Sequence, residues 1–256
     1  MYVAWVIRCG ITRRILWDKV MTQMTLGISV PEMQGQEEEE EEKCEYCDKD
    51  KHKFSATKGD NVGKSGKLSR RIISDNKNHS WYVGFRSIAA HHIICSEAMD
   101  NDESRDICRN FGYDINHKNN GVMLPSKMNL ACQLFSPLHR GGHSIGSGDG
   151  LAYPDAVKSK IQPILDSAEG GDYCSNPQAL VKKFDKVSTS ILKKIDSFSW
   201  TITADGKDYK PGGKGCSGVN SVSKKPNRTC PVDRNHLLKH NNKTIKAKKI
   251  ALTVGT

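Results

Sequence analysis

The residues of this chain best suited to chemistry are two pairs of histidines with an asparagine between them. His91 and His92 are adjacent and follow a short apolar run, and His139 and His143 are spaced four residues apart. Asn120 lies between the two pairs. A neutral imidazole suits the deprotonation of water, and several imidazoles together suit a divalent cation. The set therefore offers a general base, an orienting amide and three metal ligands for cleaving a phosphodiester.

Each piece of this pattern also has a structural interpretation when it is taken alone. A His-x3-His pair is fairly common, a His-His dipeptide is often structural, and Asn119-Asn120-Gly121 is simply a turn signal. The order along the chain favours the catalytic interpretation, because it describes a β-hairpin that leads into a helix. Positions i and i+4 share one face of a helix, so His139 and His143 are expected to meet one ion there.

The elements that must position these residues follow from hydrophobic periodicity and turn residues. Short extended segments are expected at 81–83, 88–90 and 122–124, the last closed by Pro125. Helices are expected at 68–74, 97–111, 127–134 and from 153 onward, and Pro163 should kink or shorten the last of these. The clearest amphipathic helix is 178–198, whose apolar stripe is typical of core packing. This mixture predicts an α+β fold.

Composition and charge limit the class of protein. The chain has 256 residues and a net charge of +10, although six of its acidic residues form one run, Glu37 to Glu42. A basic body suits a polyanionic partner, because each neutralised phosphate releases counterions; a soluble protein that is merely basic is the alternative. Residues 1–42 are predicted to be an appendage and acidic linker without order, since like charges repel and resist burial.

No stretch of sequence reaches the roughly 20 apolar residues that a membrane span requires. Residues 1–17 are moderately apolar, but three arginines interrupt them, and no small-residue cleavage site follows. We therefore expect no membrane association and no secretion by the general pathway. The nine cysteines are too sparse for a disulfide scaffold, and their odd number favours a reducing compartment.

Three segments resemble the AHH family of the HNH/endonuclease VII superfamily of ββα-metal nucleases. They are Ala-His-His-Ile-Ile at 90–94, Asn-Gly-Val-Met-Leu-Pro at 120–125 and Leu-His-Arg-Gly-Gly-His at 138–143. The segments at 96–100 and 111–113 are similar to AHH toxin modules of bacterial polymorphic and type VI secretion effectors. The resemblance implies a ββα-metal core surrounded by helices. It predicts a nuclease domain at 43–240, with its catalytic core at about 81–160, and a basic tail at 241–256.

The resemblance also implies a role for each residue of the motif. It makes His91 a metal ligand together with His139 and His143, and it makes His92 the general base. Asn120 would hold the loop that bears the base. The interval from Asn120 to His139 is longer than in compact members of the family, which leaves Asn119 as the alternative.

Two further residues near the second histidine pair have roles that the sequence leaves open. Arg140 is expected to contact the scissile phosphate, with a solvated arginine as the alternative. Tyr153 stands where related modules often place an aromatic residue, and core packing is the role expected for it.

The activity implied by the resemblance is metal-dependent endonuclease cleavage of DNA with little sequence specificity. The catalytic ion would be Mg, Mn, Ni or Zn. The resemblance further implies an antibacterial toxin, made in the bacterial cytoplasm, secreted by a non-Sec route and acting in the cytoplasm of a target cell. Its partners would be DNA, a cognate immunity protein and a secretion-apparatus component or chaperone. The alternatives are an RNase or structure-selective nuclease, or a non-catalytic zinc-stabilised module that binds nucleic acid.

The cysteines suggest a second metal site. Cys44 and Cys47 form a Cys-x2-Cys knuckle, and Cys216 and Cys230 lie in lysine-rich, loop-like surroundings where a core role is not expected. These four residues are predicted to bind a structural zinc that joins the start of the core to the C-terminal region, with His52 and Cys174 as alternative ligands. Three other cysteines lie among apolar residues and are expected in the core: Cys95, Cys108 and Cys132.

Overall fold

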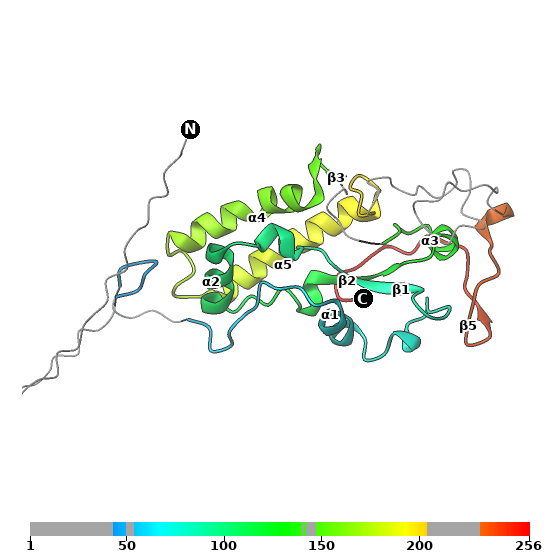
Figure 1. The fold of residues 1–256 in the computed structure, drawn as a ribbon, viewed down its shortest axis with the longest axis horizontal. Coiled ribbons are helices and arrows are strands. Elements are labelled where there is room, and N and C mark those ends of the chain that lie inside the picture. Colours follow the sequence, from blue (N-terminus) through cyan, green and yellow to red (C-terminus); the bar gives the residue numbers. More distant parts are fainter. Residues whose placement is uncertain (1–42, 50–53, 140, 142–146, 204–230) are drawn as a thin grey trace, which may run out of the picture. The chain divides into compact units, whose positions relative to one another are not determined.

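The computed structural model describes residues 43–49, 54–139, 141, 147–203 and 231–256 (Figure 1). The predicted appendage at 1–42 lies outside these residues. The described helices are α1 (Ser65–Ile72), α2 (Asp102–Phe111), α3 (Met128–Leu134), α4 (Tyr153–Glu169) and α5 (Pro177–Asp196). The strands form three antiparallel pairs: β1 (Ile88–His92) with β2 (Gly121–Pro125), β3 (Ser147–Gly148) with β4 (Leu151–Ala152), and β5 (Lys239–His240) with β6 (Lys243–Thr244). These elements confirm the α+β class.

The hairpin of β1 and β2 carries the histidine pair. His91 is paired with Val122 and His92 with Gly121, so the histidines lie at the end of β1 where β2 begins. Gly121 lets α1 approach the hairpin closely, because a Cβ at this position would lie 2.5 Å from a methyl carbon of Leu68. Leu68 is fully buried against the hairpin. Helix α1 therefore packs directly beside the end of the strands that holds the histidines.

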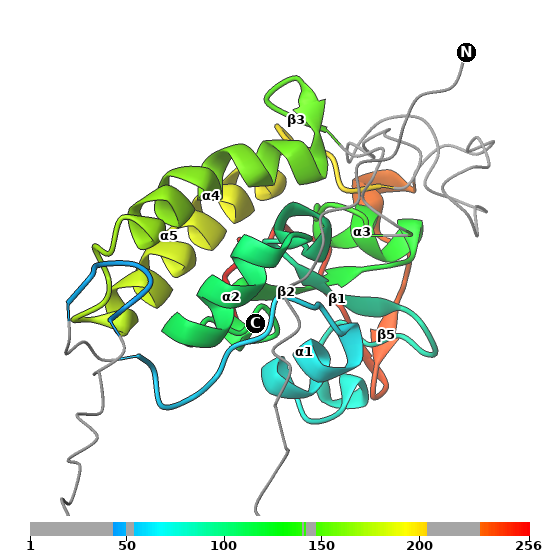
Figure 2. The same ribbon diagram turned by 60° about the vertical axis from the view of Figure 1, so that its left-hand side comes forward.

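Helices α4 and α5 lie side by side and are joined by a short loop (Figure 2). The strongly amphipathic segment predicted at 178–198 is confirmed as α5. Of the two expected effects of Pro163, a kink or a shortening of its helix, the shortening is wrong, since α4 continues from Pro163 to Glu169. Buried Ile161, Ile164 and Leu165 flank this proline, and their packing offsets the hydrogen bond that a proline cannot donate.

The apolar interior is divided between two clusters of buried side chains. The larger cluster joins α2, α4 and α5 to one face of β2. The smaller one joins α1, α3 and β1, with Leu68, Trp81, Ile88 and Met123 among its members. The hairpin lies between the two clusters, so both of its faces are covered. Apolar side chains therefore pack against the hairpin that carries the histidine pair from both faces.

Two predicted elements differ from the structure: one is divided into two helical segments, and the other forms no strand. The helix predicted at 97–111 is a 3-10 turn at Ser96–Met99 followed by α2, because the side chain of Asn101 accepts a hydrogen bond from the Ser104 amide at 2.7 Å and starts a new helix. Residues 81–83 form no strand, since the Tyr82 amide donates to the carbonyl of His79 and closes a turn.

The residues predicted as a basic tail, 241–256, pack on the core. The amide of Gly255 donates to the carbonyl of Gly121, and the amide of Met123 donates to Thr256, both at 2.7 Å. The side chain of Gln133 bonds to the carbonyl of Ile245. The free edge of β2 has polar groups that need partners, and the C-terminal residues supply them.

No helix among the described residues is long and apolar enough to cross a membrane.

Candidate active site

The two adjacent histidines have different surroundings because neighbouring residues of a strand point to opposite sides. His91 is fully buried, whereas His92 keeps 9% of its surface exposed. His91 faces Tyr153 at the start of α4, and His92 faces Asn116 in the loop that precedes β2. A buried imidazole suits an enclosed ligand, and a partly exposed one suits contact with water. The alternation of side chains along the strand therefore suits His91 to binding an enclosed ligand and His92 to contact with water.

The tautomer of His92 is set by Asn116. Nε2 of His92 lies 3.1 Å from Oδ1 of Asn116, and the same oxygen accepts from the Lys64 amide at 2.5 Å. Nδ2 of Asn116 donates to the carbonyl of Val62 and to Asp114, so the orientation of the amide is fixed. An amide oxygen only accepts hydrogen bonds, so Nε2 of His92 carries the hydrogen. In the neutral ring the lone pair is then on Nδ1, where a general base needs it.

Asn116 is itself held by Asp114, a carboxylate of the same loop that pairs with two basic residues of α1. Oδ1 of Asp114 accepts from the backbone amide of Asn116 at 2.9 Å, and Oδ2 accepts from Lys67 and Arg71 of α1 at 3.0 and 2.7 Å. Burial alone would raise the pKa of Asp114, but its hydrogen bonds with Lys67, Asn116 and Arg71 lower that pKa to about 2. An ionised carboxylate therefore anchors the amide that orients His92.

The tautomer of His91 is set by Tyr153. The hydroxyl of Tyr153 donates to the carbonyl of Ile93 at 2.6 Å, and its oxygen lies 3.1 Å from Nε2 of His91. Because the hydroxyl hydrogen is used by Ile93, the oxygen accepts from Nε2, and the lone pair of the neutral ring is on Nδ1. The sequence predicted only core packing for Tyr153. The structure shows a fully buried tyrosine that also orients His91.

His139 lies next to His91 but not on a helix. The two ring centroids are 4.9 Å apart, which is close enough for both imidazoles to bind one ion. The amide of His139 donates to the carbonyl of Pro125 at the end of β2, and the described residues around it, 136–139 and 141, are not helical. The predicted helix face is therefore wrong at His139. Pro137 disfavours a helical residue before it, and Gly141 has a left-handed φ of 79°.

Asn120 holds the chain that follows β1. Its Nδ2 donates to the carbonyls of Ile94 and Ile115, and its Oδ1 accepts from the Ile94 amide and the Ser188 hydroxyl, all between 2.8 and 3.0 Å. The side chain is fully buried and makes these four hydrogen bonds. Asn120 thus fixes the segment after the histidine pair to β2 and α5. The alternative, Asn119, bonds instead to Asp185 of α5.

Some predicted site residues lie outside the described residues. They are His143 of the metal set, Arg140 at the phosphate, and the zinc ligands Cys216, Cys230 and His52. Their assignments stay predictions. We call His91, His92 and His139, together with the side chains that orient them, the histidine site.

A second group of ligand atoms lies at the other end of the α4–α5 pair. The cysteine cluster consists of Cys44, Cys47 and Cys174, whose sulfurs all lie within 4.8 Å of one another. Cys44 and Cys174 are buried and Cys47 is partly exposed. Cys174, which the sequence offered only as an alternative, thus joins the predicted knuckle. The three cysteines expected in the core are buried there: Cys95, Cys108 and Cys132.

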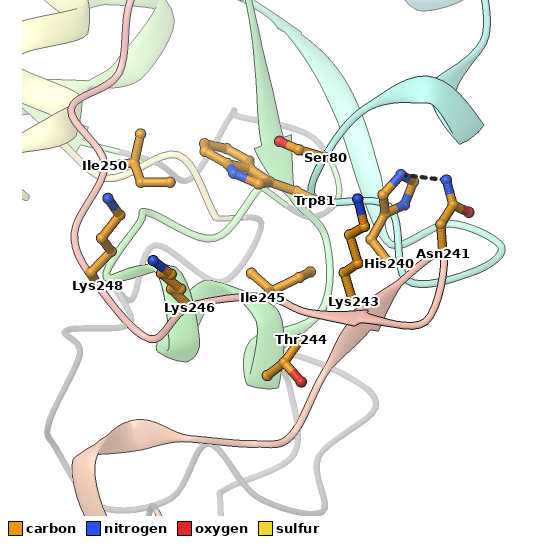
Figure 3. Close-up of a pocket in the computed structure, with 10 residues that line it drawn as sticks. All are labelled: Ser80, Trp81, His240, Asn241, Lys243, Thr244, Ile245, Lys246, Lys248 and Ile250. Carbon is orange, nitrogen blue, oxygen red and sulfur yellow. Dashed lines mark hydrogen bonds between the residues drawn. The ribbon is translucent and has the colours of Figure 1, made fainter.

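A basic pocket lies between the segment that precedes β1 and the C-terminal residues (Figure 3). Lys243, Lys246 and Lys248 line it together with Trp81, and none of its described lining residues is acidic. His240 is fixed at its rim, since its Nδ1 donates to the carbonyl of Tyr82 at 2.9 Å. Three ammonium groups around one pocket favour an anionic ligand such as a phosphate.

The sequence did not predict the orienting roles of two residues, Asn116 and Tyr153. Asn116 lies 24 residues from His92, and no spacing in the chain connects an asparagine with that ring. The only local signal is the alternation of polar Asp114 and Asn116 with apolar Tyr113 and Ile115. The sequence singled out the position of Tyr153 but did not predict that it orients His91, because 62 residues separate the two.

Part of the chain matches a known protein family. Residues 75–191 match the model of the AHH family, a nuclease family of the HNH/ENDO VII superfamily with conserved AHH. The match contains β1, β2, Asn116, Asn120 and the start of α4, whereas α1 and the C-terminal residues lie outside it. Searches of the curated proteins and of the solved structures gave no match. Residues 75–191 of this chain are therefore similar to the AHH nuclease family.

Proposed function

We propose that this chain is an endonuclease that hydrolyses DNA phosphodiesters with little sequence specificity, and that His92 is its general base. The observation that carries the proposal is the hydrogen bond between Asn116 and Nε2 of His92, which leaves the lone pair on Nδ1. In the reaction, Nδ1 takes a proton from a water molecule, the water oxygen bonds to phosphorus, and the bond to the leaving oxygen breaks. The leaving oxygen then gains a proton from solvent.

Nucleases of this superfamily use a divalent metal ion, and the residues present fit one. We assign its binding to His91 and His139, whose rings are adjacent, and to His143, as the sequence predicts. The bond from Tyr153 puts the lone pair of His91 on Nδ1, and such hydrogen bonds commonly orient metal-binding histidines. When bound, the ion supplies charge compensation for the phosphate and the leaving oxygen. Mg, Mn, Ni and Zn are the candidates, with imidazole ligands suiting the last two best.

DNA would be held mainly through its phosphates. The net charge of +10 and the pocket with Lys243, Lys246 and Lys248 support electrostatic binding without base recognition. Arg140 is assigned to the scissile phosphate on the basis of the sequence motif. Affinity for DNA should therefore fall steeply as salt is added.

The biological role that we propose is an antibacterial toxin, and it rests on the resemblance to AHH toxin modules. In this role the protein is made in a bacterial cytoplasm, leaves by a non-Sec route with a secretion component or chaperone, and acts in the cytoplasm of a target cell. A cognate immunity protein would protect the producing cell. Expression of the chain in a bacterium with and without the His92→Ala change tests the toxic activity.

The substrate is tested by incubating the protein with supercoiled plasmid and with total RNA side by side. Each reaction is run with Mg, Mn, Ni or Zn, and with a chelator as the control. We expect nicked and linear plasmid with at least one of these ions, and no cleavage with the chelator. Cleavage of RNA alone would replace DNA by RNA as the substrate. Absence of cleavage of both would favour a non-catalytic nucleic-acid-binding module.

A further inference from the structure

The sulfurs of the cysteine cluster lie close enough together to bind one metal ion. Sγ of Cys44 and Sγ of Cys174 are 3.9 Å apart, and the three sulfurs lie within 4.8 Å of one another. A tetrahedral zinc with Zn–S bonds of about 2.3 Å separates its sulfurs by about 3.8 Å. A disulfide would need about 2 Å between two sulfurs. The distance between Cys44 and Cys174 thus matches two ligands of one ion.

The knuckle around Cys44 has the backbone arrangement of a metal-binding turn. The amide of Tyr46 donates to Sγ of Cys44 at 3.3 Å, and the amide of Asp48 donates to the carbonyl of Cys44 at 3.0 Å. These two hydrogen bonds hold the backbone of the turn around the Cys44 sulfur. The turn therefore fixes the position of one candidate ligand atom.

The loop that carries Cys174 approaches the knuckle closely. A Cβ on Gly171 would lie 2.7 Å from Cβ of Cys47 and 2.8 Å from the carbonyl oxygen of Tyr46, and Gly171 has a φ of 81°. Only glycine fits both this contact and this backbone conformation. The loop between α4 and α5 is thus shaped to bring Cys174 to the two cysteines of the knuckle, although 130 residues separate Cys44 from Cys174.

We propose that Cys44, Cys47 and Cys174 bind a structural zinc ion that fastens residues 43–49 to the α4–α5 loop. Three thiolates select a soft divalent cation, and zinc is the common one in such sites. Among the described residues the group has these three ligands, so the fourth position belongs to water or to a ligand outside the described ranges. The ion would stabilise the fold without taking part in phosphodiester cleavage. The proposal does not depend on the nuclease activity.

The test replaces zinc by cobalt(II) in the full chain and records its absorption spectrum. Thiolate ligands give cobalt(II) a near-ultraviolet charge-transfer band that imidazole ligands do not give. We expect this band in the wild-type protein and in the His91→Ala variant, and its loss in Cys174→Ser. We also expect Cys174→Ser to lose about one zinc per chain by elemental analysis, and its melting temperature to fall by at least about 5 °C.

The matched control is Cys108→Ser, which changes an equally buried thiol outside the cluster. It should keep the charge-transfer band and the zinc content even if its melting temperature falls. Absence of the band from the wild-type protein would overturn the proposal, whatever the stability of the variants. Zinc content that is unchanged in Cys174→Ser, or a disulfide between two of the three cysteines in the purified protein, would overturn it as well.

Discussion

The histidine site and the cysteine cluster both gather candidate metal ligands, but they are held in different ways. Each histidine of the adjacent pair has a buried polar partner that fixes the hydrogen on its ring, Asn116 for His92 and Tyr153 for His91. The cysteines are brought together by a short turn and a glycine at a close contact. A catalytic histidine must present one defined ring nitrogen to its substrate or metal. At a structural site, binding of the ion itself can fix the positions of the thiolates. The side chains that orient His91 and His92 therefore distinguish the histidine site from the cysteine cluster.

The largest effect is expected from removing the base. His92→Ala should lower the rate of plasmid cleavage by about 10²–10⁴-fold, because general-base catalysis contributes that much. Its melting temperature should stay close to that of the wild type, since His92 is at the edge of the core with 9% of its surface exposed. Single-turnover cleavage and thermal unfolding measure the two quantities. Wild-type cleavage by this variant would rule out the proposed base.

Removing an orienting partner should have the next largest effect. Asn116→Ala frees Nε2 of His92 and should lower kcat by about 10–100-fold with little change in metal affinity. Asn119→Ala is the control, because Asn119 bonds to Asp185 and not to a histidine of the site. The pH dependence of kcat should shift in Asn116→Ala alone. Equal losses in both variants would indicate a general loss of stability.

A matched pair of tyrosine variants compares the two sites directly. Tyr153→Phe removes the hydroxyl that orients His91 and should weaken binding of the catalytic ion by about 10–100-fold. Tyr46→Phe removes a hydroxyl that accepts a hydrogen bond from Nδ2 of Asn110, and it should leave the thiolate-to-cobalt band unchanged. Titration with metal, followed by absorption or calorimetry, gives both results. Loss of the band in Tyr46→Phe would contradict the view that the cysteine cluster does not depend on the Tyr46 hydroxyl.

Sequence alone predicted the parts of the site that lie close together in the chain. The α+β class, α5 and the hairpin follow from periodicity and turn residues, and the role of Asn120 follows from the resemblance to the AHH family. The helix expected at His139 was wrong because Pro137 and the left-handed Gly141 outweigh the His-x3-His spacing.

Contacts between distant segments could not be predicted in this way. Asn116 was missed because nothing local connects an asparagine with a ring on another strand. Cys174 was only an alternative ligand, since no spacing rule pairs cysteines 130 residues apart. Both assignments depend on how the chain folds back on itself, which the hydrophobic pattern does not specify.

The smallest effect is expected at the basic pocket. Changing Lys243, Lys246 and Lys248 together to alanine should weaken DNA binding roughly tenfold and lower the salt dependence of binding by about one unit of slope for each phosphate that is no longer neutralised. The cleavage rate at saturating DNA should stay unchanged. Fluorescence anisotropy at several salt concentrations measures the slope. An unchanged slope would place the DNA on another surface.

The division of roles between the two adjacent histidines can be tested by metal titration of His91→Ala and His92→Ala. We predict that His91→Ala loses binding of the catalytic ion and that His92→Ala keeps it, while neither variant cleaves plasmid at the wild-type rate. Loss of the ion in His92→Ala together with its retention in His91→Ala would contradict this division.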